Sequence, residues 1–289
     1  MNSTKLLLQY RTIKVSVLFF LFFSIFYNSV NAQSAIKGKI ISAKDGRAAA
    51  FASVKLISRD NGTISDSSGN FSLPARGLKQ TDTLIISLIG YEALKIPAHK
   101  ALSQSEFTLQ LMQKTMESVV IRSFSKEEIA GAKSEVVGYY RSWNTDNTKG
   151  EIGRTFLPAH KEYQVAKVRF KVYNTYDTCI IRLHIREVTN GQPGRELLRD
   201  SIAQVINKSP VAEKPYEFDL NKYNVILSQQ NIFVSFEVLE GTKSDNSLHS
   251  LSFVGSEEGN YFYKSGDSDS WHSSDDYTIY MKLLLKYDE

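Results

Sequence analysis

From residue 33 onward the chain consists of short runs in which apolar and polar residues alternate, separated by turn residues. Such alternation predicts β-strands that bury one face. The segment 82–90 is nearly all apolar, which is typical of a strand buried on both faces. No long amphipathic helix interrupts these runs, so the first part of the chain is expected to be an all-β sandwich. The alternating runs are at 36–40, 53–57, 70–74, 107–111 and 118–122.

Residues 123–134 are polar and charged, with helix formers but little apolar periodicity. They predict a linker with one helical turn. Strand patterns resume after it, and the turn-rich segment 190–194 should end one strand sharply. Residues 135–289 are therefore expected to form a second β-rich domain, a jelly-roll-like sandwich. Its firmest strands are predicted at 165–173, 179–188, 231–240 and 277–287.

The N-terminus has the three parts of a secretory signal peptide. Three basic residues precede an apolar run at 15–27, and Val30 and Ala32 occupy the −3 and −1 positions of a cleavage site. The apolar run is shorter than the roughly 20 residues that a membrane-spanning helix needs, although a retained signal anchor is the alternative. We expect residues 1–32 to be removed and the product to be exported to the periplasm, the outer-membrane surface or the medium.

Charge and cysteine content narrow the function. The segment 1–32 carries three positive charges and no negative one, so its removal lowers the formal net charge from +4 to +1. A nearly neutral protein is not expected to bind nucleic acid. Cys179, the sole cysteine, excludes an internal disulfide and a zinc site of several cysteines. It shares an apolar strand face with Ile181 and Leu183, which predicts a core residue rather than a nucleophile.

The opposite faces of two neighbouring strands are basic. We expect a hairpin through 174–178 that places Arg169 near Arg182 and Lys167 near His184. Because like charges directly opposite one another are destabilising, something must neutralise them. One interpretation is internal pairing, and the other is an external anion such as an acidic glycan or a lipopolysaccharide phosphate. The acids available for internal pairing are Glu217, Asp219 and Glu237.

The loop 264–277 is a second candidate site. It gathers Asp267, Asp269 and Asp275 around Trp271, so it can be interpreted as a Ca²⁺ loop with a tryptophan that stacks on a sugar ring. The order of acidic residues in this loop does not match that of an EF-hand loop. The alternative is an exposed polar loop in which only the side chain of Trp271 is packed against the protein. Calcium is the one cofactor considered.

A third candidate is the stretch that contains Asp66, Gly69 and Phe71. One carboxylate cannot supply the six to eight oxygens that Ca²⁺ takes. Asp66 is therefore predicted to bind turn amides, while Gly69 adopts a positive φ and Phe71 returns to the core.

A set of spaced residues forms one pattern between residues 35 and 111: Asp45, Gly46, Val54, Gly62, Thr63, Asp66, Gly69, Phe71, Ile89, Gly90 and Tyr91. By this pattern residues 35–111 resemble the carboxypeptidase regulatory-like domain. The resemblance implies a transthyretin-like Greek-key sandwich, here within 33–122, in a small exported envelope protein of a Gram-negative bacterium. Residues 116–123 are similar to the segment that follows this domain in TonB-dependent transporters, but too few residues remain for a plug and a barrel.

No catalytic motif accompanies these patterns: there is no nucleophile elbow, phosphate loop or metalloprotease helix. The expected function is a non-enzymatic binding or adhesion module for a glycan or an outer-membrane protein. The alternatives are a glycan hydrolase, whose two carboxylates need not be close in sequence, and an accessory partner of a TonB-dependent transporter. The ligand-binding candidates are Arg169, Arg182, His184 and Trp271.

Overall fold

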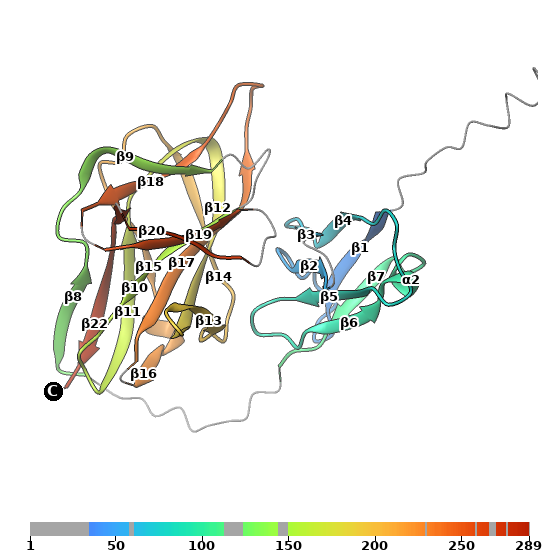
Figure 1. Ribbon diagram of the computed structural model, residues 1–289, viewed down its shortest axis with the longest axis horizontal. Helices are drawn as coiled ribbons and strands as arrows, with labels where there is room; N and C mark the ends of the chain where they lie inside the picture. Colours follow the sequence, from blue (N-terminus) through green and yellow to red (C-terminus); the bar gives the residue numbers. More distant parts are fainter. Residues whose placement is uncertain are drawn as a thin grey trace, which may run out of the picture. The chain divides into compact units, whose positions relative to one another are not determined.

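A computed structural model of the chain is built almost entirely of β-strands (Figure 1). The expected signal peptide and residues 116–123 lie outside the residues that it describes. Within the described part, the helices are one turn of α-helix, α2 (Ala98–Ala101), and one of 3₁₀-helix, η1 (Asn221–Tyr223), and neither is long enough to cross a membrane. The structure describes residues 35–57, 61–112, 124–143, 150–228, 230–257, 259–265, 270–275 and 277–288.

Two small sheets contain the strands of the first part of the chain. One has the order β4-β1-β7 and the other has the order β3-β2-β5-β6. Side chains from both sheets share one core, to which Ile40 and Phe107 contribute from the first sheet and Val54 and Ile86 from the second. These strands are β1 (Ala35–Ser42), β2 (Ser53–Leu56), β3 (Asn61–Ile64), β4 (Asn70–Pro74), β5 (Thr83–Ser87), β6 (Leu94–Pro97) and β7 (Glu106–Leu109).

Strand β5 differs from its expected burial. Leu84 and Ile86 are fully buried, but Ile85 between them is only half-buried. The strand therefore buries one face in the core, and the burial expected on both faces is wrong. Its other face carries Thr83 and Ser87 on either side of Ile85.

The rest of the chain forms a ten-stranded and a five-stranded sheet. The ten-stranded sheet has the order β20-β19-β10-β17-β12-β18-β21, with β13 and β14 paired to β12 and β9 paired to β18. The five-stranded sheet has the order β15-β11-β22-β8, with β16 paired to β11. The strands are β8 (Lys126–Gly131), β9 (Val136–Trp143), β10 (Gly150–Phe156), β11 (Glu162–Phe170), β12 (Val172–Thr189), β13 (Gln192–Glu196), β14 (Ile202–Ser209), β15 (Tyr216–Asp219), β16 (Ile226–Ser228), β17 (Ile232–Thr242), β18 (Leu251–Ser256), β19 (Tyr261–Ser265), β20 (His272–Ser274), β21 (Thr278–Ile279) and β22 (Met281–Tyr287).

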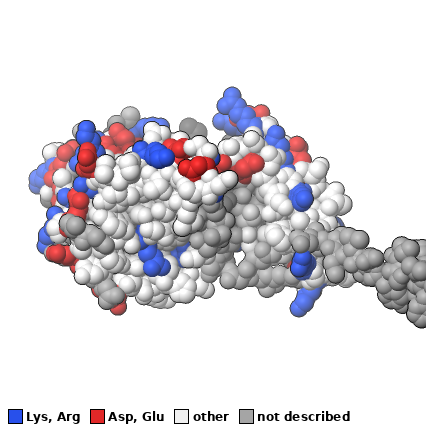
Figure 2. All heavy atoms as spheres, turned by 90° about the horizontal axis from the view of Figure 1, so that it is seen from above, with Lys and Arg blue, Asp and Glu red and all other residues white. Residues whose placement is uncertain are grey.

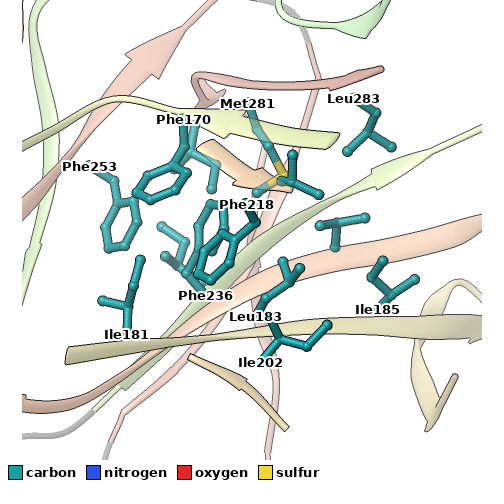
Figure 3. Close-up of a cluster of buried hydrophobic side chains, with 14 of the residues drawn as sticks. Phe170, Ile181, Leu183, Ile185, Ile202, Phe218, Phe236, Phe253, Met281 and Leu283 are labelled. Atoms are coloured by element: carbon teal, nitrogen blue, oxygen red, sulfur yellow. The ribbon is translucent and has the colours of Figure 1, made fainter. Parts of the chain in front are cut away.

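A large hydrophobic core lies between these two sheets (Figure 3). Phe170 of the five-stranded sheet packs against Phe236 of the ten-stranded sheet, with ring centroids 4.3 Å apart. Phe236 in turn stacks on Phe253 at 5.6 Å. The sheets therefore pack face to face as a sandwich, and the all-β fold class predicted from the alternation is confirmed.

The expected hairpin between the two basic strands is wrong. β11 belongs to the five-stranded sheet and β12 to the ten-stranded sheet, with only Lys171 between them. The apolar faces of both strands contribute to the same core, since Phe170 and Leu183 belong to one buried cluster. Residues 174–178 are part of β12 rather than a loop. The strands thus meet across the core instead of side by side.

The linker expected at 123–134 is also wrong in part. Its middle forms β8, an edge strand paired with β22 in the register Lys126↔Tyr287 to Gly131↔Lys282. Most side chains of β8 are exposed, and Ile129 is one of them. Only its last two residues are half-buried, so the strand depends mainly on backbone pairing and shows no hydrophobic alternation. The strand expected at 118–122 lies outside the described residues.

Candidate functional site

Seven charged side chains gather on the outer face of the ten-stranded sheet. The register places Glu151 of β10 opposite both Lys264 of β19 and Glu237 of β17, and Glu237 opposite Arg182 of β12. Because side chains alternate along a strand, His184 and Arg186 share this face with Arg182. We call this group the charged cluster. It comprises Glu151, Arg182, His184, Arg186, Glu196, Glu237 and Lys264.

Glu151 lies at one end of the charged cluster and is 2% exposed. Its carboxylate accepts hydrogen bonds from Arg186 and from the Ser235 hydroxyl at 2.5 Å, and it pairs with Lys264 Nζ at 3.2 Å. Burial alone would raise the pKa of Glu151. The positive charge of Arg186, aided by His184 and Lys264, outweighs burial and holds that pKa well below its usual value.

His184 connects two further carboxylates. Its Nδ1 lies 2.6 Å from Glu196 Oε2, and its Nε2 lies 2.9 Å from Glu237 Oε2. Ionised carboxylates only accept hydrogen bonds, so both ring nitrogens must donate and the side chain must be the imidazolium, with a proton on each nitrogen. Burial and Arg186 lower the pKa of His184, but the surrounding glutamates, including Glu151, raise it above its ordinary value.

Glu237 is shared between His184 and Arg182. Arg182 donates to Glu237 Oε2 from Nε at 2.9 Å and from Nη2 at 2.6 Å. Burial opposes the charge of Glu237, and the pairing with Arg182 and His184 lowers its pKa far below the usual value. With three glutamates, two arginines and one lysine, the charged cluster is balanced before the proton on His184 is counted.

A tight hairpin positions Glu196. β12 turns into β13 through Asn190 (φ 52°) and Gly191 (φ 74°), and β13 returns beside β12. Glu196 Oε1 then accepts hydrogen bonds from the backbone amides of Ile185 at 3.0 Å and Leu198 at 3.1 Å. The turn residues at 190–194 were the one sequence signal for this partner of His184. Nothing local in the sequence indicated Glu151 or Lys264.

Trp271, just before β20, covers part of the charged cluster. Its ring lies 5.7 Å from the Arg186 guanidinium carbon and 4.9 Å from Lys264 Nζ. It also packs edge-on against Phe233 at 5.1 Å. The half-buried Trp271 thus shields two of the cations that hold Glu151. Of the predicted ligand-binding residues, Arg182, His184 and Trp271 come together on this face.

Arg169 lies elsewhere, on the five-stranded sheet. It faces Glu217 in the register of β11 and β15 and donates to it at 2.6 Å, while Lys167 donates to the same carboxylate at 2.7 Å. Asp219, opposite Lys167, accepts a hydrogen bond from the Asn221 amide at 3.0 Å. Acids of the protein therefore pair with the basic residues on both sheets. On the face shown in Figure 2, Lys and Arg atoms lie beside Asp and Glu atoms along the rim.

The structure describes one of the three aspartates that were predicted as calcium ligands. Asp275 is exposed, while Asp267 and Asp269 lie outside the described residues. Within the part of the chain that is described, no three His, Cys, Asp or Glu side chains gather as metal ligands. Cys179 is fully buried, and burial raises the pKa of its thiol to about 12.

The stretch around Asp66 has the geometry of a turn. Asp66 Oδ1 accepts hydrogen bonds from the amides of Ser68 at 2.9 Å and Asn70 at 2.8 Å. Gly69 has a φ of 81°, and a Cβ at this position would come within 2.5 Å of the Ile40 carbonyl oxygen. Phe71 is buried in the core of the first sandwich.

Comparison with known proteins places the first part of the chain in a class. Residues 36–121 match the family model of the CarboxypepD_reg-like domain. The carboxypeptidase regulatory-like domain inferred from the sequence is therefore confirmed for these residues. No curated protein matches the chain.

Solved structures give only distant likenesses. The clostridial cysteine protease Cwp84 after propeptide cleavage is 11% identical, with a TM-score of 0.42, over 56% of this chain and 40% of that one. The cysteine protease and lectin-like domains of Cwp84, a surface-layer-associated protein of Clostridium difficile, are 11% identical, with a TM-score of 0.36, over 54% of this chain and 37% of that one. The chain thus spans less than half the length of either structure, and likeness at this level carries no functional argument.

Proposed function

We propose that this protein is an exported, non-enzymatic binding module of the cell envelope, and that its second β-sandwich recognises glycan. In this proposal residues 1–32 are a signal peptide, residues 33–122 are the regulatory-like domain and residues 135–289 carry the binding surface. The observation that supports the non-enzymatic part of the proposal is that the charged cluster joins its acids and bases in fixed pairs.

The ion pairs of the charged cluster are unfavourable for glycoside hydrolysis. That reaction needs a carboxylic acid whose pKa is raised so that it can protonate the leaving group. The cations of the charged cluster instead lower the pKa of Glu151, Glu196 and Glu237. His184 uses both ring nitrogens on carboxylates, which leaves no free nitrogen to act as a base.

The single thiol supports the same proposal. A cysteine nucleophile must be accessible and must ionise readily. Cys179 is enclosed in the core, and its pKa is raised. The alternative of a transporter accessory partner rests on residues 116–123, which lie outside the described residues.

A glycan array probed with residues 33–289 tests the proposal. We expect retention on at least one class of glycan, with no release of new reducing ends from the retained material. A protein-free incubation provides the control for turnover. Cleavage above that control would show a hydrolase, and retention on no glycan would reject the binding function.

A further inference from the structure

A row of aromatic side chains lies along β9, β19 and β20. Tyr139 packs against Tyr277 with centroids 4.6 Å apart, and its hydroxyl lies 3.4 Å from that of Tyr261. Tyr261 packs against Tyr263 at 5.8 Å, and Tyr263 against His272 at 5.4 Å. With Arg141, these five residues form what we call the tyrosine cluster.

The tyrosine cluster is anchored at one side and open at the other. Tyr261 is 3% exposed and belongs to the large core, whereas Tyr277 is 37% exposed and His272 is exposed. A Cβ on Gly255 would come within 2.2 Å of Tyr139 Cδ1, so the ring of Tyr139 fits closely over the backbone there. Tyr139 and Tyr263 are half-buried and pack against the same core, so Tyr277 and His272 are the accessible rings of the tyrosine cluster.

Arg141 contributes the charge of this surface. Its guanidinium lies 4.0 Å from the centroid of the Tyr263 ring and 5.8 Å from that of Trp143. Among the described residues no carboxylate pairs with Arg141, in contrast to Arg169, Arg182 and Arg186. Stacking on a ring orients a guanidinium while leaving its five N–H donors for other partners.

The tyrosine cluster is distinct from the charged cluster. On β19, Tyr261 and Tyr263 point to one face, and Lys264 points to the other, toward Trp271. His272 follows Trp271 directly and faces Tyr263 in the register of β20. Trp271 is thus committed to covering Arg186 and Lys264, while the tyrosine cluster lies on the opposite side of the same strands.

We propose that the tyrosine cluster binds a carboxylated sugar, a uronic acid residue of an acidic polysaccharide. This inference rests on the proposed glycan-binding function. A planar carboxylate matches the fork of Arg141 with two parallel hydrogen bonds. The sugar ring that carries the carboxylate can stack on the neighbouring tyrosine rings, which present large, rigid surfaces with a polar tip. One uronate residue satisfies both features at once.

Titration calorimetry with residues 33–289 tests this inference. The probes are polygalacturonate and the same polymer after full methyl esterification, which keeps the sugar ring but removes the charge. We expect the ester to bind about tenfold more weakly or worse, since a charge-assisted pair is lost. Arg141→Gln should weaken polygalacturonate binding by a similar factor, and Arg141→Lys should weaken it too because the fork is lost.

Two further variants separate loss of binding from loss of folding. Tyr277→Ala lies at an exposed position and should weaken binding without unfolding the protein. Arg195→Gln removes an exposed arginine of β13 that pairs with Glu187, and it should leave affinity unchanged. Equal affinity for the acid and the ester, or undiminished binding by Arg141→Gln, would overturn the inference. So would competition by inorganic phosphate at the same site, which would indicate a phosphate ligand.

The glycan array distinguishes the binding of uronate from the binding of glycan in general. Binding to neutral glycans alone would overturn the uronate inference while the glycan-binding function stands. Binding to no glycan would overturn both.

Discussion

The charged cluster predicts that stability falls as the pH rises through the neutral range. His184 lies between Glu196 and Glu237, so the folded protein holds its proton more tightly than the unfolded chain does. Because the pKa of His184 is raised in the folded protein, its proton stabilises the fold fully at a pH below about 6.5, the pKa of histidine in the unfolded chain. This stabilisation is lost as the pH rises from that value to the pKa of His184 in the folded protein. Between the two values the loss is about 1.4 kcal/mol per pH unit.

The perturbation that isolates this effect is His184→Gln. Removing one partner of a buried ion pair costs about 3–5 kcal/mol, which is a large share of the 5–15 kcal/mol typical of a whole protein. We therefore expect the variant to be less stable than the wild type at pH about 5.5. The difference should shrink as the pH rises above about 6.5, because only the wild type loses the bound proton.

Urea unfolding of both proteins, from pH about 5.5 to about 9, measures the difference directly. His249, whose pKa is raised by hydrogen bonds to Asp245 and to the Thr175 backbone, is present in both proteins and cancels in the comparison. His99→Gln, at an exposed position, is the matched control and should follow the wild type at every pH. A difference in stability that stays level or widens with pH would contradict the raised pKa of His184.

Three further predictions concern single positions. Glu151→Gln removes the negative charge that Arg186 and Lys264 share, so it should lower the free energy of unfolding by about 3–5 kcal/mol in urea titrations. A loss below about 1 kcal/mol would contradict the pairing. Gly69→Ala should lower the melting temperature, because its φ is positive and a Cβ has no room; an unchanged value would argue against the turn geometry. Cys179 should resist alkylation by iodoacetamide at pH about 8 until the protein is unfolded, and rapid labelling of the native protein would contradict its burial.

Local sequence patterns predicted those features that depend on neighbouring residues alone. The alternation of apolar side chains identified β11, β12, β17 and β22, and the apolar face of Cys179 is buried as expected. These inferences succeed because the period of two in a strand determines which side chains share a face.

The pattern could not show which strands pair. β11 and β12 have the same design and are separated by Lys171 alone, yet they enter different sheets. Both arrangements bury the same apolar faces, so local periodicity does not distinguish a hairpin from a crossing between sheets. β8 was missed for the opposite reason, since an edge strand with exposed side chains leaves no hydrophobic pattern.

The charged cluster depends on the same long-range pairing. Glu151 pairs with both Lys264 and Arg186 because β19, β10, β17 and β12 lie side by side, in that order, in one sheet. The sequence therefore indicated that the basic faces needed acids, and it offered Glu217 and Glu237 among the candidates. It could not identify Glu151, which is far from β12 in sequence and adjacent to it only through β17.

The second sandwich is proposed to bind glycan without cleaving it. The most direct test incubates residues 33–289 with each glycan retained on the array and measures newly formed reducing ends over time. We expect stable retention with no reducing ends above those of a protein-free control. Reducing ends that accumulate above that control would show a hydrolase instead.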